Sequence, residues 1–149
     1  MLSKLKVLYL CTGNSCRSQM AEGWTRHLRG DLIETWSAGT VPKSLDPRAV
    51  EVMREAGVDI SEHRSKAVDD LLDVDIDCVV TVCDGAHESC PVFPGRARIV
   101  HRGFDDPPKL AEQAASEEEA LLCYRRVRDE IREFVESLPE GIIEERRAE

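Results

Sequence analysis

The chain has 149 residues, of which 33% are charged and 42% hydrophobic, and its formal net charge is −9. This length is enough for one domain with its own hydrophobic core. The acidic excess argues against a nucleic-acid partner and against an anionic membrane surface. No stretch approaches the length of a membrane span, and the apolar run at 7–10 is shorter than the roughly 7–15 residues of a signal-peptide core. We expect a cytoplasmic protein.

Six cysteines are spread along the chain. A disulfide framework is typical of small secreted proteins with weak cores. This chain shows no export signal and is long enough to fold without such a framework. Thiols kept for chemistry or for metal binding are therefore the better interpretation.

Strand-like and helix-like segments alternate. In chain order we expect a strand at 5–10, a helix from Ser18, a strand at 33–39, a helix at 46–57, a loop with a short helix at 61–72, strands at 75–83 and 98–101, and a long helix at 116–138. The helix at 46–57 has clear end signals, because Asp46 is a good N-cap, Pro47 suits the first helical position and Gly57 is typical of a C-terminus.

The segment at 75–83 is a continuous β-branched run of the kind that parallel sheets bury on both faces. The segment at 116–138 carries apolar residues at helical spacing, Leu121, Leu122, Val127, Ile131, Phe134, Val135 and Leu138, and should pack on that sheet. This alternation predicts a three-layer α/β domain with a four-stranded parallel sheet and right-handed crossovers. We place a single catalytic domain at 1–138 and expect a charged, solvated tail at 139–149.

The run Cys11-Thr12-Gly13-Asn14-Ser15-Cys16-Arg17-Ser18 joins the first expected strand to the first expected helix. A loop in this place presents backbone N–H groups at a helix N-terminus, which is a ready anion site. Arg17 offers a planar fork that fits a tetrahedral oxyanion. The same positive field favours the thiolate of Cys11, which is the nucleophilic form. The segment can therefore bind an oxyanion and attack it.

A second group begins where the third expected strand ends, at the same edge of the sheet. It contains Cys83 and Cys90, with His87 between them. Two such cysteines can form a redox pair, can ligate a metal together with His87, or can be small buried hydrophobes. A metal would need further ligands, and the nearest candidate, Cys11, lies beside the cation of Arg17. We favour the redox pair.

The segment Gly103-Phe104-Asp105-Asp106-Pro107 follows the fourth expected strand and returns to the same edge. A carboxyl group there could donate a proton to a departing oxygen. Asp-Pro is also a turn former, so the carboxylates could simply cap a turn. The residues by themselves leave both interpretations open.

Together, the segments at 11–24, 82–91 and 103–107 resemble the thioredoxin-coupled arsenate reductases, which share the fold of the low-molecular-weight protein tyrosine phosphatases. The similarity runs from about Leu5 to about Val135 without a large gap. The first motif alone identifies only the phosphatase-like superfamily, whereas the three together are specific.

This resemblance implies the roles of the first attack. Cys11 would be the nucleophile on arsenate, Ser18 would hydrogen-bond its thiolate, and Asp106 would protonate the leaving oxygen. The substrate-binding residues would be Thr12, Gly13, Asn14, Ser15, Cys16, Arg17 and Ser18.

The resemblance also implies a relay of three thiols. Cys83 would attack Cys11 and expel arsenite, which leaves a Cys11–Cys83 disulfide. Cys90 would then attack Cys83, and thioredoxin would reduce the resulting Cys83–Cys90 disulfide. Neither a cofactor nor a metal is expected in this chemistry.

Two positions depart from the family. Some members hold a potassium ion behind the loop with residues that match Asn14, Glu22 and Ser37 and with an aspartate. The aspartate position is Lys66 here, so we expect its ammonium to pair with Glu22 in place of a cation. Arg102 replaces a tryptophan that is common in the family.

Two alternatives remain. A low-molecular-weight protein tyrosine phosphatase would need Cys11, Arg17 and Asp106 but not the later cysteines. A non-enzymatic thiol redox or metal-binding module would use Cys83 and Cys90 alone. The remaining cysteines, Cys78 and Cys123, are expected in the core, and Cys16 could be no more than a turn residue.

Overall fold

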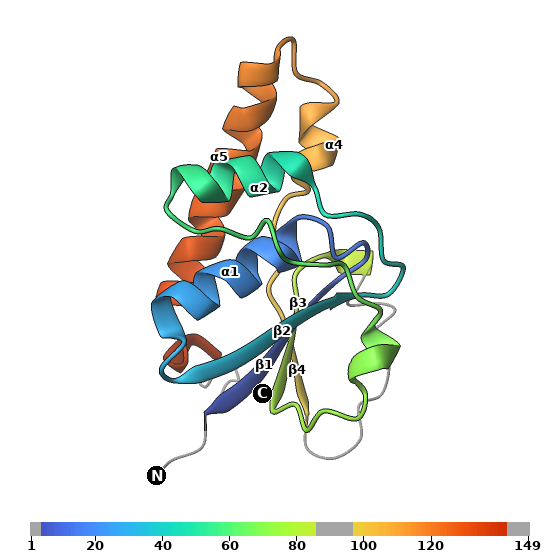
Figure 1. The fold of residues 1–149 in the computed structure, drawn as a ribbon, viewed down its shortest axis with the longest axis vertical. Helices are drawn as coiled ribbons and strands as arrows, with labels where there is room; N and C mark the ends of the chain where they lie inside the picture. The colour runs from blue at the N-terminus through green and yellow to red at the C-terminus, as the bar shows by residue number, and fades with distance from the viewer. Residues whose placement is uncertain (1–3, 86–96, 143–149) are drawn as a thin grey trace.

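The computed structural model describes residues 4–85 and 97–142. Its centre is a four-stranded sheet in the order β2-β1-β3-β4, and every neighbouring pair is parallel (Figure 1). The strands are β1 (Leu5–Cys11), β2 (Ile33–Gly39), β3 (Cys78–Thr81) and β4 (Arg98–His101). The helices are α1 (Arg17–Arg29), α2 (Pro47–Glu55), the 3-10 helix η1 (Val68–Leu71), α4 (Pro107–Ala111) and α5 (Glu117–Glu136). The predicted α/β fold with a four-stranded parallel sheet is confirmed.

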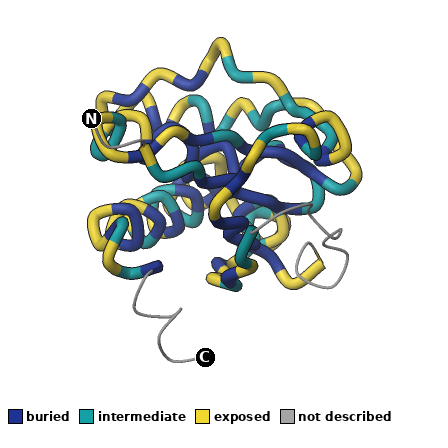
Figure 2. The backbone as a smooth tube through the Cα atoms, turned by 90° about the horizontal axis from the view of Figure 1, so that it is seen from below, coloured by how far each residue is buried: buried dark blue, intermediate teal, exposed yellow. Residues whose placement is uncertain are grey.

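The central strand β1 is buried on both faces. Val7, Leu8, Tyr9 and Leu10 are all 0% exposed, and the middle of the tube in Figure 2 is correspondingly dark blue. A parallel sheet buried on both faces accounts for the continuous apolar run. Because all four strands run the same way, the residues that follow them meet at one edge.

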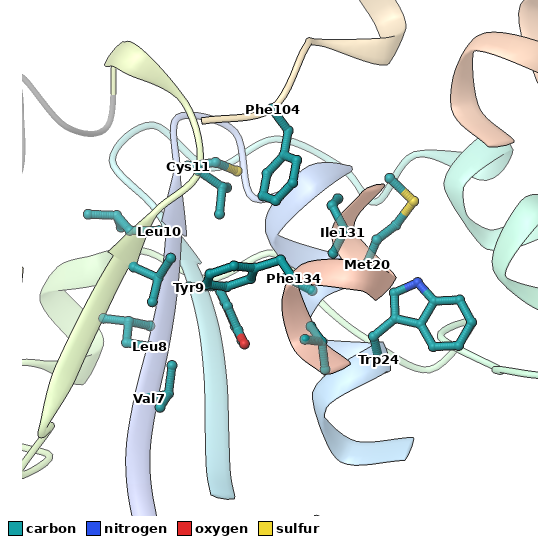
Figure 3. Close-up of a cluster of buried hydrophobic side chains, with 14 of the residues drawn as sticks. Val7, Leu8, Tyr9, Leu10, Cys11, Met20, Trp24, Phe104, Ile131 and Phe134 are labelled. Atoms are coloured by element: carbon teal, nitrogen blue, oxygen red, sulfur yellow. The ribbon is translucent and has the colours of Figure 1, made fainter. Parts of the chain in front are cut away.

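The helices pack over the sheet and against one another. Helix α1 contacts β1, β2 and α5, while α2 and α4 lie against α5 (Figure 1). Side chains from β1, α1 and α5 meet in the core that Figure 3 shows, with Trp24 and Ile131 at most 1% exposed. The long helix is thus held by an apolar stripe, as its spacing predicts.

Two helices begin at residues whose side chains cap them, and the sequence predicts the first of these caps, at Asp46. Asp46 precedes α2, and its carboxylate accepts from the Arg48 amide at 2.9 Å. Ser116 precedes α5, and its hydroxyl accepts from the Glu119 amide at 3.1 Å. Each cap satisfies a backbone N–H that has no partner within the helix.

Several details differ from the sequence predictions. The third strand is shorter than 75–83, because ladder pairing with β1 covers only Cys78–Thr81. Leu122 and Cys123 were expected in the core, but Leu122 is 55% exposed and Cys123 is only half-buried. The buried face of α5 contains Leu121, Tyr124 and Ile131, and Leu122 lies on the opposite side of the helix. In the expected tail, Ile142 is 3% exposed and joins the core.

None of the helices within 4–85 and 97–142 is long and apolar enough to cross a membrane.

Candidate active site

The loop between β1 and α1 wraps around the Cys11 sulfur. The Asn14 amide lies 3.1 Å from Cys11 Sγ, and Ser18 Oγ lies 2.8 Å from it. Ser18 Oγ also accepts from Asn14 Nδ2 at 2.8 Å, which leaves the hydroxyl proton of Ser18 to point at the sulfur. Two donors therefore converge on Cys11, as the binding of a thiolate requires.

The loop has this shape because Asn14 is locked in an unusual conformation. Its φ is +50°, in the left-handed region, and its side chain is fully buried. Asn14 Oδ1 accepts from the Lys66 amide at 2.8 Å and from Gln19 Nε2 at 3.1 Å, and its carbonyl accepts from Ser65 Oγ at 2.7 Å. Sequence reasoning gave no role to Gln19, although it directly follows the loop, and it missed Ser65, which is far from Asn14 in the sequence.

Close approach of β2 also shapes the loop. A Cβ at Gly39 would lie 2.6 Å from the Thr12 carbonyl oxygen and 3.0 Å from the Asn14 amide. Only glycine fits between β2 and the loop without displacing backbone. The glycine turn that ends the second expected strand is therefore part of the site.

Arg17 is the first residue of α1, and its side chain is held by the segment that follows β4. Its Nη1 donates to the Phe104 carbonyl at 2.9 Å, and its Nη2 lies 3.6 Å from Asp106 Oδ1. The side chain is 15% exposed. A positive group thus lies at the helix N-terminus, where unpaired backbone N–H groups already favour an anion.

The structure separates the two neighbouring carboxylates after β4. Asp105 turns to α5, where it accepts from Arg126 at 3.0 Å. Asp106 occupies the N-cap position of α4 but makes no side-chain capping bond, and its side chain is 42% exposed beside Arg17. Asp106 is therefore the carboxyl group that faces the oxyanion site.

Cys83 lies against the same loop. It is 6% exposed, and its Sγ is 3.4 Å from Thr12 Oγ1. A Cβ at Gly85 would lie 2.9 Å from the same hydroxyl oxygen, so the chain after Cys83 passes directly over Thr12. Cys90 and His87 lie outside the described residues.

The other cysteines behave differently. Cys78 is 3% exposed in β3, as expected for a core residue. Burial raises the pKa of the Cys16 thiol well above its usual range, and the nearby Asp46 carboxylate adds to the rise. Cys16 thus stays protonated near neutral pH. Within the described part of the chain, no three His, Cys, Asp or Glu side chains are grouped so that they could hold a metal ion.

Behind the loop, Glu22 is a buried carboxylate that lies close to three basic side chains. Its side chain is 3% exposed, and it lies 2.6 Å from Arg26 Nη1, 3.3 Å from His63 Nδ1 and 3.9 Å from Lys66 Nζ. The predicted pairing of Lys66 with Glu22 is confirmed. The Lys66 ammonium, which also donates to the Arg64 carbonyl at 2.8 Å, thus supplies positive charge where some family members hold potassium, while Glu22 Oε1 and Ser37 Oγ are buried without a hydrogen-bond partner among the described residues.

His63, which the sequence left unassigned, connects this cluster to the loop. Its Nδ1 lies 3.0 Å from Gln19 Oε1, and Gln19 in turn donates to Asn14. Burial lowers the pKa of His63. The Glu22 carboxylate raises this pKa in part, and the cations of Arg26 and Lys66 lower it further.

This pKa shift predicts a pH-dependent stability. Below pH 6.5 His63 binds a proton in the unfolded chain, whereas in the folded chain it stays neutral until the pH falls to its lowered pKa. The free energy of unfolding should therefore decrease as the pH falls from 6.5 toward that lower value. We expect His63→Gln to flatten that slope, measured by denaturant unfolding between about pH 7 and about pH 5. The exposed His27→Gln is the matched control. Equal slopes in the two variants would refute the assignment.

Taken as a whole, the site has a thiol nucleophile, a loop of backbone donors, an arginine and a carboxyl group at one edge of a parallel sheet. Those parts define a phosphatase-like oxyanion site. Residues 6–148 match the model of the low molecular weight phosphotyrosine protein phosphatase family. The chain belongs to this family.

Its relatives include arsenate reductases. The chain is 45% identical over 139 residues to the arsenate reductase of Bacillus licheniformis, which covers 93% of this chain and 98% of that protein. The structure resembles that of an arsenate reductase in the phosphate-binding state, with a TM-score of 0.71, 31% identity and coverage of 90% of this chain and 95% of that one. It also resembles the thioredoxin-dependent arsenate reductase of Corynebacterium glutamicum, with a TM-score of 0.68, 26% identity and coverage of 95% and 62%.

Proposed function

We propose that the chain is a cytoplasmic arsenate reductase that converts arsenate to arsenite through Cys11, Cys83 and Cys90 and is regenerated by thioredoxin. The observation that carries the proposal is the second thiol at the oxyanion loop, where Cys83 Sγ lies 3.4 Å from Thr12 Oγ1. A phosphatase needs no second thiol. The reduction of arsenate needs two electrons, which a pair of thiols can supply.

In the first step the Cys11 thiolate attacks the arsenic atom. Arg17 and the amides of the loop hold the oxyanion, whose charge they match. A sulfur–arsenic bond forms, one oxygen departs as water, and Asp106 supplies a proton to it. The exposure of Asp106 lets this carboxyl group recover its proton from solvent.

In the second step the Cys83 thiolate attacks Cys11 Sγ. The new sulfur–sulfur bond replaces the sulfur–arsenic bond, and the electron pair of the broken bond leaves with arsenic as arsenite. Arsenic is thereby reduced by two electrons, and two thiols become one disulfide. The Thr12 hydroxyl beside Cys83 Sγ keeps this thiol at the loop.

Cys90 completes the relay in this proposal. Its thiolate attacks Cys83, frees Cys11 and leaves a Cys83–Cys90 disulfide that the thioredoxin dithiol reduces. The thioredoxin dependence stated for the Corynebacterium glutamicum relative supports this partner. Working thiols also suit the reducing conditions of the cytoplasm.

A weak phosphatase side activity follows from the same parts. Phosphate has the geometry of arsenate, and Cys11, Arg17 and Asp106 are the groups that a phosphatase needs. Asp106 is followed by Pro107, Pro108 and Lys109, so there is no tyrosine to hold the ring of a phosphotyrosine. Hydrolysis of small phosphate esters is expected to be slow.

The test is arsenate-dependent oxidation of NADPH by the purified chain with thioredoxin and thioredoxin reductase. We expect arsenite to appear in step with NADPH loss. A phosphatase would hydrolyse phosphate esters without oxidising NADPH. A metal-binding module would contain bound metal and show neither activity.

The Lys66 ammonium leads to a further prediction. Because it already lies beside Glu22, turnover in potassium and in sodium at equal ionic strength should differ by less than about twofold, since screening is then the same. Lys66→Asp, which restores the ligand type of the potassium-binding members, should make turnover depend on potassium. Strong activation of the wild-type chain by potassium over sodium would contradict this account.

A further inference from the structure

Arg102 lies at the start of the segment that carries Asp106, and the proposed chemistry gives it no role. Its backbone amide donates to the Thr81 carbonyl at 2.9 Å, which fixes its place just beyond β4. Its guanidinium carbon lies 4.9 Å from the ring centroid of Phe104 and 5.8 Å from that of Phe134. Both distances lie within the range of a cation–π interaction.

The two rings also contact each other. Phe104 and Phe134 are arranged edge to face, with centroids 6.2 Å apart, and each is 9% exposed. Figure 3 shows Phe104 at the Cys11 end of the core. Arg102 thus covers a pair of rings that joins the active-site segment to α5.

The backbone of Phe104 reaches the site directly. Its carbonyl accepts from Arg17 Nη1 at 2.9 Å, and its amide donates to the Val82 carbonyl at 3.1 Å. An uncharged carbonyl orients the guanidinium without cancelling its charge. The position of Phe104 therefore sets the direction in which Arg17 presents its other N–H groups.

We propose that Arg102 is a positioning residue for oxyanion binding: by clamping Phe104 against Phe134, it keeps the Phe104 carbonyl aimed at Arg17. This inference rests on the proposed function, because it assumes that Arg17 binds the substrate oxyanion. Arg102 itself does not touch the substrate.

The test compares the dissociation constant of inorganic phosphate, measured by calorimetric titration, in wild type and Arg102→Leu. We expect phosphate binding to weaken about two- to fivefold, the range for loss of an exposed cation–π contact. The melting temperature should change little, because Arg102 is exposed. Arg102→Lys should restore most of the affinity, since an ammonium also interacts with aromatic faces.

Arg132→Leu is the matched control. Arg132 also stacks on a ring, at 5.0 Å from Trp24, and its loss removes the same charge away from the loop. Phosphate affinity should be unchanged in this variant. Phe134→Leu removes a ring and no charge, and it should weaken phosphate binding in the same direction as Arg102→Leu.

Measurements at two ionic strengths distinguish the positioning of Arg17 by Arg102 from a direct electrostatic attraction between Arg102 and phosphate. The Debye length falls from about 10 Å at 0.1 M salt to about 3 Å at 1 M salt. The affinity ratio between Arg102→Leu and wild type should persist at both concentrations. A ratio that vanishes at high salt, or an Arg102→Leu variant with wild-type affinity, would overturn the inference alone, whereas a wild-type chain that binds no phosphate would overturn the proposed function as well.

Discussion

Cys11→Ser is expected to abolish arsenate reduction and phosphate-ester hydrolysis together while leaving the fold intact. A serine hydroxyl is not ionised near neutral pH, and the Ser18 hydroxyl and the Asn14 amide that lie within hydrogen-bond distance of Cys11 Sγ are not bases. The loss should exceed about 10⁴-fold, as for other enzymes that lose their nucleophile. Both activities are measured on the same preparation, and the melting temperature verifies the fold.

Cys123→Ser is the matched control, since Cys123 lies half-buried in α5 and has no part in the proposed relay. It should keep wild-type turnover. Sustained turnover by Cys11→Ser would remove this residue from the mechanism.

Loss of Cys90 is expected to have a different signature. Cys90→Ser should release one arsenite per enzyme and then stop, trapped as the Cys11–Cys83 disulfide, because the relay has lost the thiol that attacks Cys83. Cys83→Ser should release none, because the arsenic bound to Cys11 cannot be expelled without the second thiol. A single-turnover measurement of arsenite with thiol counting distinguishes the two variants.

The proposed Cys83–Cys90 disulfide places a requirement on the geometry of the chain. A disulfide needs its two Cα atoms within about 4.4–6.8 Å, whereas a helix from Cys83 to Cys90 would separate them by roughly 10 Å. Asp84 and Gly85 are helical in the structure. Formation of the bond would therefore require unwinding, which Gly85 would ease. Sustained thioredoxin-dependent turnover by Cys90→Ser would refute the three-thiol relay.

Features with local causes could be predicted from the sequence. The start of α2 follows from Asp46 and Pro47, and the buried strand β1 follows from its apolar run. Helix α4 was missed, since Asp106-Pro107 is as typical of a turn as of a helix start. Cys123 was misplaced, because the propensity of a cysteine for burial does not specify which side of a helix faces the core.

In the site, too, residues that belong to one continuous motif could be predicted, and residues brought together by folding could not. The loop from Cys11 to Ser18 has a contiguous signature, so its residues could be named in advance. The network behind it could not, because His63 and Ser65 meet Gln19, Asn14 and Glu22 only after distant segments pack together. The carbonyl of Phe104 has no sequence signature at all, since every residue has one.

In the proposed mechanism, this site reduces arsenate with electrons from its own thiols. The most direct test mixes the fully reduced wild-type chain with arsenate in the absence of any other reductant and counts both arsenite and free thiols. We expect one arsenite released and two thiols lost for each enzyme molecule, because the oxidation of two thiols to one disulfide supplies two electrons. Release of no arsenite, with every thiol retained while phosphate esters are still hydrolysed, would contradict this mechanism and leave a phosphatase.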